Sequence, residues 1–231
     1  MEPKKRRQAE TIFLILASLF ITSLVTSNLI FQKFFSWNPF GWYHFELSVG
    51  IIAYPVTFLI TDIISEIYGS KRANSVVIAG IFASFFALLI VVVSTEAQAT
   101  TWSPIGNVVF KKVFGFTYIA VGASLAAYLF AQFLDVKVFH FWKRVTHGKH
   151  LWIRNNFSTI TSQLVDTITV LLLLCGFGVI EWELFWKLML NGYLFKVMFA
   201  LCDTPIIYVM VHYIRKHFEM VDVNKHLLED N

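Results

Sequence analysis

The chain has 231 residues, of which 57% are hydrophobic and 15% charged, and its formal net charge is +4. An ordinary soluble domain has about a quarter of its residues charged, so this composition excludes that class. The apolar residues fall in blocks near the length of a membrane span. Basic residues lie mainly between the blocks, so the positive charge indicates membrane orientation rather than binding to nucleic acid.

Apolar run length predicts six membrane-spanning helices, at about 11–35, 46–68, 73–93, 114–134, 158–180 and 188–213. Helices are expected because lipid offers no water to an open backbone, and the runs lack the alternation of a barrel strand. The predicted fold class is therefore an all-α membrane protein. We expect residues 1–10 to form a basic N-terminus, 11–216 a single transmembrane domain and 217–231 a polar tail. The first run has no small-residue cleavage site, so it is predicted to be a retained span.

Most of the 19 basic residues fall on one side of the six predicted spans. Because basic loops stay in the cytoplasm, both termini are predicted to be cytoplasmic. The inner loop 135–156 mixes aromatic and basic residues, which predicts a helix lying on an anionic membrane surface. The outer loop 94–113 is expected to be a plain connector, with a re-entrant segment as the alternative.

The second predicted span ends in a run of polar residues that a lipid-facing helix would not carry. Asp62 and Glu66 are four residues apart, so on a helix they share one face. Thr61 lies beside them, and Tyr54 and Phe58 form another pair with the same spacing. A carboxylate at membrane depth normally faces a cavity or a partner. The segment is therefore predicted to line a polar pocket.

Two prolines stand near acidic residues in the predicted spans. Pro55 is expected to leave the carbonyl of Ile51 without its helical donor. Pro205 follows Asp203 by two residues, and broken helices beside acids are a feature of transporter binding sites.

Other spans carry further polar residues at a similar depth. From the helical rise, Asp62, Asp166 and Asp203 each lie roughly 10–15 Å from the inner end of their spans. Lys196 stands two turns before Asp203 and could neutralise one acid. The remaining negative charge would be met by a cationic substrate, by protonation, or by Arg72 or Arg154. Asn28 in the first span and Gln163 in the fifth are the weaker candidates.

The alternative explanation for each polar residue is a hydrogen bond or ion pair that only joins two helices. An intramembrane aspartyl protease would need a glycine-flanked GxGD motif, but Asp62 follows Ile60-Thr61 and Asp203 follows Leu201-Cys202. The chain shows no HExxH, GxSxG or P-loop pattern. A channel with rings of one acid is not indicated by three different acids on three helices. We therefore expect neither an enzyme nor a metal site.

Several separated motifs follow one another along the chain. The longest is Tyr54-Pro55-x-Thr57-Phe58-Leu59-x-Thr61-Asp62-x-x-Ser65-Glu66-x-Tyr68-Gly69. Others are Gln132-Phe133-Leu134-Asp135-Val136-x-Val138-Phe139, Arg154-Asn155-Asn156-x-Ser158-Thr159, Gln163-x-x-Asp166-Thr167 and Lys196-x(6)-Asp203-Thr204-Pro205. In these motifs and in Asn28, the chain from about residue 11 to 216 resembles the queuosine precursor transporter family. That family is also called the vitamin uptake transporter-like family.

The resemblance implies a six-helix bacterial inner-membrane protein that imports a queuosine precursor for tRNA modification. The substrate would be a 7-deazaguanine base such as preQ0, preQ1 or queuine. The implied site holds Asp62, Glu66, Asp166, Asp203, Lys196, Asn28, Gln163, Thr61, Tyr54 and Phe58. Carboxylates would accept N–H bonds from the base, amide and lysine groups would donate to it, and aromatic rings would stack on it. No cofactor is implied.

The fold is also similar to the substrate-binding subunits of energy-coupling-factor vitamin importers. The alternative function is therefore a substrate-binding or assembly subunit that needs a partner for transport. The sequence does not decide the preferred precursor or the energy coupling, and a homo-oligomer stays open.

Overall fold

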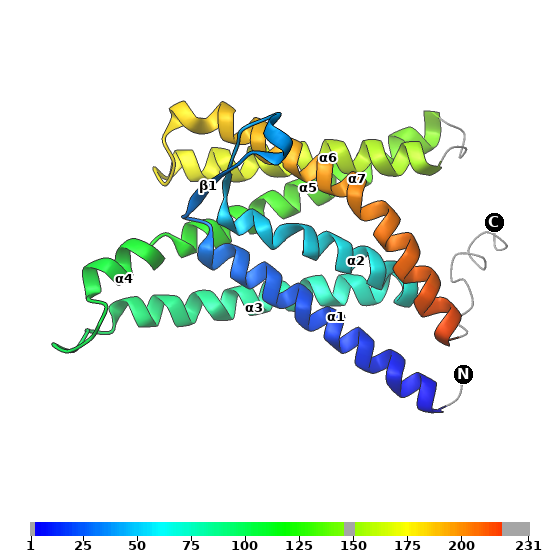
Figure 1. Ribbon diagram of the computed structural model, residues 1–231, viewed down its shortest axis with the longest axis horizontal. Coiled ribbons are helices and arrows are strands. Elements are labelled where there is room, and N and C mark those ends of the chain that lie inside the picture. Colours follow the sequence, from blue (N-terminus) through cyan, green and yellow to red (C-terminus); the bar gives the residue numbers. More distant parts are fainter. Residues whose placement is uncertain (1–2, 146–150, 219–231) are drawn as a thin grey trace. The chain divides into compact units, whose positions relative to one another are not determined.

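The computed structural model describes residues 3–145 and 151–218, and this part of the chain is mostly helical (Figure 1). In chain order the elements are α1 Pro3–Ile30, β1 Phe34–Trp37, η1 Pro39–Gly41, β2 Phe45–Ser48, η2 Val49–Ile52, α2 Tyr54–Tyr68, α3 Ser70–Glu96, α4 Asn107–Phe114, α5 Thr117–Val145, α6 Leu151–Gly176, η3 Trp182–Leu184 and α7 Phe185–Phe218.

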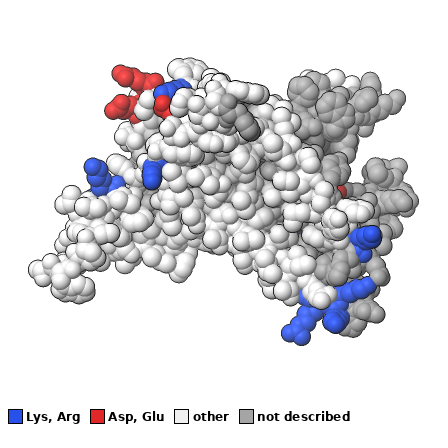
Figure 2. Space-filling view, in the orientation of Figure 1, with Lys and Arg blue, Asp and Glu red and all other residues white. Residues whose placement is uncertain are grey.

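Five helical stretches of the described chain are long and apolar enough to cross a membrane: Lys4–Ile30, Val49–Tyr68, Lys71–Glu96, Asn107–Tyr128 and Trp182–Ile214. Ile160–Gly176 is a shorter apolar helix. On the face drawn in Figure 2, charged side chains form small groups and most of the surface carries no charge. These features confirm a mostly helical chain with several membrane-spanning segments.

The helices divide into two compact units, each assembled from separate parts of the chain. The first unit consists of Met1–Ser27, Ile52–Ala87 and Phe199–Asn231. The second consists of Asn28–Ile51 and Leu88–Met198. Three long helices, α1, α3 and α7, therefore contribute one part to each unit.

The core of the first unit is built on one face of α2. Ile60, Ile63, Ile64 and Ile67 are buried there at the three- and four-residue spacing of a helix. They pack with buried side chains of the other helices in this unit, namely Leu16, Phe20, Ala73, Val76 and Val211. Thr57 is buried with these isoleucines, whereas Asp62, Ser65 and Glu66 lie on the exposed or partly exposed surface of α2.

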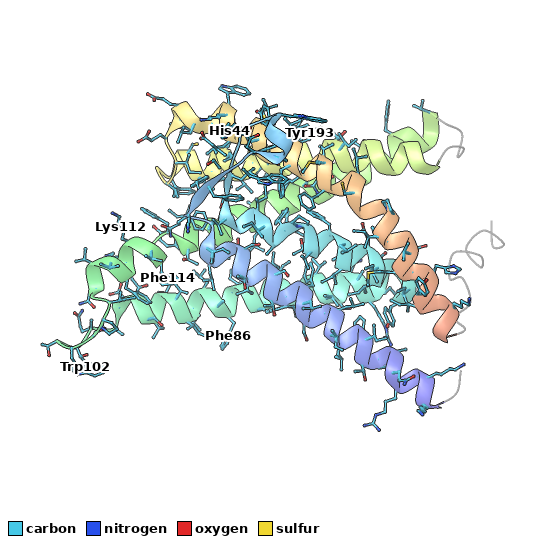
Figure 3. All side chains as sticks on the ribbon, in the orientation of Figure 1. His44, Phe86, Trp102, Lys112, Phe114 and Tyr193 are labelled. Atoms are coloured by element: carbon cyan, nitrogen blue, oxygen red, sulfur yellow. The ribbon has the colours of Figure 1, made fainter. Side chains whose placement is uncertain are left out.

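The turn between α2 and α3 depends on a glycine. Gly69 has a φ of 86°, which side chains rarely tolerate, and its N–H donates to the carbonyl of Ser65. The chain reverses within one residue, so α3 begins at Ser70. Further along α3, Phe86 is 64% exposed and its ring extends away from the helix (Figure 3). A surface of this kind suits contact with lipid.

The core of the second unit joins α5, α6 and the first part of α7. Ala120 and Ala123 of α5 bring that helix close to Leu171 and Leu174 of α6. The cluster also contains Phe31, Ile119, Cys175, Ile180, Phe185 and Leu188. Small residues at such a contact allow two helix backbones to approach closely.

A short antiparallel hairpin replaces the ends of the first two predicted spans. The first helix ends at Ile30 rather than near residue 35, and the helical part of the second begins after residue 48 rather than at 46. Strands β1 and β2 pair Phe34 with Ser48 and Trp37 with Phe45. Between them lie Pro39, which begins a 3-10 turn, and Gly41, whose φ is 74°. A proline and a left-handed glycine in one loop prevent the helix from continuing.

The two prolines lie at different points of their helices. Pro55 lies in the first turn of α2, where a backbone N–H has no helical partner, so it does not interrupt that helix. The missing donor to the Ile51 carbonyl stays a prediction. Pro205 lies inside α7, which runs from Phe185 to Phe218 as one helix, so the chain has no helix break there.

The two long loops also contain more helix than the sequence predicted. The outer loop 94–113 contains most of α4, so it is more than a plain connector. Trp102 lies at the tip of the connection between α3 and α4 (Figure 3). In the inner loop, residues 135–145 continue α5 and residues 151–156 begin α6, so no separate surface helix forms among the described residues.

Replacing Gly80 with alanine should destabilise the first unit. A Cβ atom at Gly80 would lie 2.8 Å from Phe20 Cε1 and 3.0 Å from Leu24 Cδ2. The overlap should outweigh the better helix propensity of alanine and lower the free energy of unfolding by about 1 kcal/mol. Thermal unfolding of the purified protein in detergent measures the effect. Gly122→Ala in α5 is the control, because its Cβ meets nothing within 4 Å. Equal melting temperatures for the two variants would contradict this packing.

Candidate functional site

A buried ion pair joins α6 to α7 in the second unit. Lys196 Nζ donates to Asp166 Oδ2 at 2.6 Å, and the two side chains are only 11% and 7% exposed. The helices are joined by a short connection, so they run antiparallel. At Gly192 they approach closely, because a Cβ there would lie 3.5 Å from Thr167 Cγ2. The pair lies one turn further along α7, and Lys196 does neutralise one of the acids, as expected.

More polar groups surround this pair on α6. Ser162 and Thr167 are buried, and the Thr167 hydroxyl donates to the Gln163 carbonyl at 2.8 Å. The side-chain oxygen of Gln163 is buried without a hydrogen-bond partner in the described part of the chain. Gln163 precedes Asp166 by three residues, so both lie on one side of the helix. Three of the predicted site residues, Gln163, Asp166 and Lys196, therefore belong to one polar cluster.

Asn28 forms a separate contact in the same unit. Its side chain is buried, and its Oδ1 accepts a hydrogen bond from Ser124 Oγ of α5 at 2.8 Å. The contact ties the end of α1 to α5, which fits the helix-joining role that was the alternative for this residue. This bond uses the acceptor oxygen of the Asn28 amide, and the N–H₂ group at the other side of the amide is a hydrogen-bond donor.

A second polar network joins the hairpin to α7, and sequence reasoning missed it. Tyr43 Oη donates to Asn191 Oδ1 at 2.8 Å, and Asn191 is 1% exposed. Lys187 Nζ, one turn earlier on α7, donates to Glu46 Oε1 at 2.6 Å. An asparagine inside an apolar run was the only signal, and it does not identify its partner.

Aromatic side chains reinforce this attachment. The ring of Trp37 lies edge-on to that of Phe195, with centroids 5.9 Å apart. The rings of Tyr43 and Phe45 have centroids 4.7 Å apart. Phe195 immediately precedes Lys196, so the hairpin contacts α7 next to the ion pair.

In the first unit, α2 presents its polar residues on the side opposite its isoleucine face. The rings of Tyr54 and Phe58 lie edge to face, 5.0 Å apart, as their spacing predicted. Asp62 is exposed and Glu66 is partly exposed, so neither acid is buried in the core of the unit, and the polar pocket that they would line stays a prediction. The Thr61 hydroxyl donates to the carbonyls of Thr57 and Phe58 at 3.0 and 2.9 Å. Its proton is therefore used within the helix.

Arg72 does not reach toward the acids of the spans. Its guanidinium forms two hydrogen bonds with Glu10, of 3.0 and 2.9 Å, which joins the start of α3 to α1. It also lies over the rings of Phe13 and Tyr68, at 5.1 and 5.8 Å from their centroids. Tyr68 Oη in turn donates to the carbonyl of Ala9. Arg72 thus serves a structural contact.

The ten predicted site residues fall into groups that belong to different units. Tyr54, Phe58, Thr61, Asp62 and Glu66 lie on α2 in the first unit, and Asn28, Gln163, Asp166 and Lys196 lie in the second. Asp203 lies within α7, but its side chain is outside the described part, as is that of Arg154. Convergence of all ten stays a prediction. Among the described residues, no three metal-ligating side chains gather into one group.

Removing the buried lysine should be far more harmful than removing an exposed one on the same helix. Lys196→Met would leave Asp166 buried without its cation, and the free energy of unfolding should fall by about 3–5 kcal/mol. Lys187→Met is the matched control: its pair with Glu46 is about half exposed, so the loss should stay below about 1 kcal/mol. Thermal unfolding in detergent compares the two. Combining Lys196→Met with Asp166→Asn should restore most of the stability, and failure to do so would contradict the proposed cause.

Comparison with known proteins places the chain in a family. A family model described as putative vitamin uptake transporter matches residues 48–210, which is more than half of the chain. A probable queuosine precursor transporter of Bacillus subtilis (strain 168) is 29% identical over 162 residues, 70% of this chain and 70% of that protein. A probable queuosine precursor transporter of Haemophilus influenzae (strain ATCC 51907 / DSM 11121 / KW20 / Rd) is 31% identical over 127 residues, 54% of this chain and half of that protein. No solved structure matches significantly.

The family match covers the α2 motif and the α6–α7 ion pair, and the comparisons confirm the resemblance found in the sequence. The family consists of transporters, so the prediction that the chain is not an enzyme is also confirmed. The chain is a multi-pass membrane protein that belongs to the vitamin uptake transporter family.

Proposed function

We propose that this chain imports a queuosine precursor, a 7-deazaguanine base such as preQ0, preQ1 or queuine, across the bacterial inner membrane for tRNA modification. The observation that carries the proposal is the family match together with the relative from Bacillus subtilis, which is 29% identical over 70% of the length of both chains. The buried ion pair between α6 and α7 supports it, since charged groups inside membrane helices mark substrate pathways.

The substrate site would lie in the membrane body, residues 11–216, and use polar residues of its helices. On α2, Asp62 and Glu66 point away from the isoleucine core of their unit. A carboxylate at this depth avoids lipid and faces water or a polar partner, so this side of α2 would line the substrate path. Tyr54 and Phe58 would stack on the planar base, and Asp203 would supply another acceptor.

The chemistry of a guanine-like base fits these groups. Its pyrimidine edge presents N–H donors that a carboxylate can accept in pairs. Its carbonyl and ring nitrogen need donors, which Lys196 and the amide of Asn28 would provide. The ammonium group of preQ1 would suit an acid that Lys196 does not already neutralise.

Both termini would lie in the cytoplasm, with α6 as the sixth crossing beside the five longer spans. The basic residues support this orientation, because most lie between predicted spans on that side. The prediction is that a fluorescent reporter fused after residue 231 matures in the cytoplasm, while alkaline phosphatase fused there stays inactive. An active phosphatase fusion at that position would overturn the orientation.

Expression of this chain should restore queuosine to the tRNA of a bacterial strain that can neither make nor import its precursors. Asp62→Ala and Asp203→Ala should each lower uptake of labelled preQ1 at least about tenfold, because a charged hydrogen bond to the base is lost. Membrane levels measured by immunoblot should stay unchanged. Glu183→Ala is the matched control, since Glu183 is an exposed acid beyond the site.

Full uptake by both aspartate variants would remove these residues from the proposed site. Binding of preQ1 without restored tRNA queuosine would favour the alternative, a binding subunit that needs a partner.

A further inference from the structure

The side-chain oxygen of Gln163 is an unusual atom within the polar cluster of α6. It is buried and has no hydrogen-bond partner in the described part of the chain. Buried polar atoms in native proteins are almost always paired, so each exception calls for an explanation. The other two exceptions among the described residues are the hydroxyls of Ser84 and Thr117. A hydroxyl can rotate toward a carbonyl of its own helix, whereas an amide oxygen can only accept.

Two donors of the same polar cluster are bonded to other atoms. The Thr167 hydroxyl, one turn along α6, donates to the backbone carbonyl of Gln163 and not to its side chain. Lys196, from the facing helix, donates to Asp166 at 2.6 Å. The oxygen of Gln163, three residues before Asp166 on α6, is thus a buried acceptor that no described side chain satisfies.

The net charge of this polar cluster limits the kind of donor that can bind to the Gln163 oxygen. Asp166 and Lys196 neutralise each other, and Gln163 itself carries no charge. A cationic group would find no net negative charge in this pair, whereas a neutral N–H or amino group needs only the acceptor. The edge of a heteroaromatic base offers such donors in a planar, uncharged form.

We propose that Gln163 is a specificity-determining residue whose side-chain oxygen accepts a hydrogen bond from a neutral N–H group on the ring edge of the transported base. This inference rests on the proposed function and adds to it. It gives Gln163 the role of acceptor, whereas the sequence had grouped it with the donors. It also predicts that substrates with and without an aminomethyl side chain are read here in the same way, through the ring that they share.

The test compares three unlabelled bases as competitors of labelled preQ1 uptake: 7-deazaguanine, 7-deazahypoxanthine, which lacks the 2-amino group, and N1-methyl-7-deazaguanine. The wild-type chain should prefer 7-deazaguanine to at least one of the other two by about tenfold or more, because that analogue leaves the acceptor unpaired. Gln163→Met keeps the length of the side chain and removes the acceptor. It should reduce this preference to within about twofold.

Thr117→Val is the matched control, because it also removes a buried, unpaired polar atom of the same unit. Its preference among the bases should equal that of the wild type. If Gln163 had a purely structural role, Gln163→Met would change the amount of folded protein but not the order of the competitors.

The outcomes separate this inference from the proposed function. No uptake of any deazapurine by the wild type overturns both. If the wild type takes up preQ1 and Gln163→Met keeps the wild-type preference among the bases, this inference alone is overturned. The Gln163 oxygen would then accept its hydrogen bond from a bound water. If Gln163→Met does not fold, measurements on the wild type alone still test the inference. The inference is overturned if all three bases compete equally with preQ1 for uptake and raise the melting temperature of the purified protein equally.

Discussion

The ion pair between Lys196 and Asp166 is the constraint on which the second unit depends. The two charged side chains are only 11% and 7% exposed, so they have lost most of their contact with solvent. The free-energy cost of this desolvation is offset only if the ion pair stays intact. The pair therefore fixes the register of α7 against α6. The two helices lie close together at Gly192 and Thr167 in this register, because a Cβ at Gly192 would already be in van der Waals contact with the facing methyl group.

The hairpin extends this constraint to the connection between α1 and α2. Tyr43 and Glu46 bind two residues of α7 that are one turn apart, so the hairpin opposes rotation of that helix. The Trp37 ring against Phe195 adds a contact beside Lys196. A short loop thus helps to orient a charged side chain that lies far from it in the sequence.

The first unit is arranged by a different principle, the amphipathic character of α2. Its isoleucines are buried in the unit core, and this leaves Asp62 and Glu66 on the opposite side. On the face drawn in Figure 2, charged side chains are few and most of the surface carries no charge. Because acids at membrane depth face water or a polar partner rather than lipid, Asp62 and Glu66 would line a polar path. This is why α2 is central to the proposed transport function.

The sequence by itself determined that the chain is mostly helical and crosses a membrane, and which polar residues interrupt the apolar helices. Run length and composition were enough, since lipid permits few backbone structures. The same local patterns correctly paired Tyr54 with Phe58 along α2. The motifs were specific enough to identify the family.

Only the tertiary structure decided which polar side chains meet. Lys196 could have neutralised any of several acids, and its pairing with Asp166 depends on the packing of α6 against α7. The bond of Arg72 to Glu10, 62 positions earlier, and that of Tyr43 to Asn191, 148 positions later, left no local pattern either. The hairpin was missed because its apolar residues continue the runs of two spans. Helix formation is a local property with a regular period, whereas the partner of a buried charge is set by residues that only folding brings together.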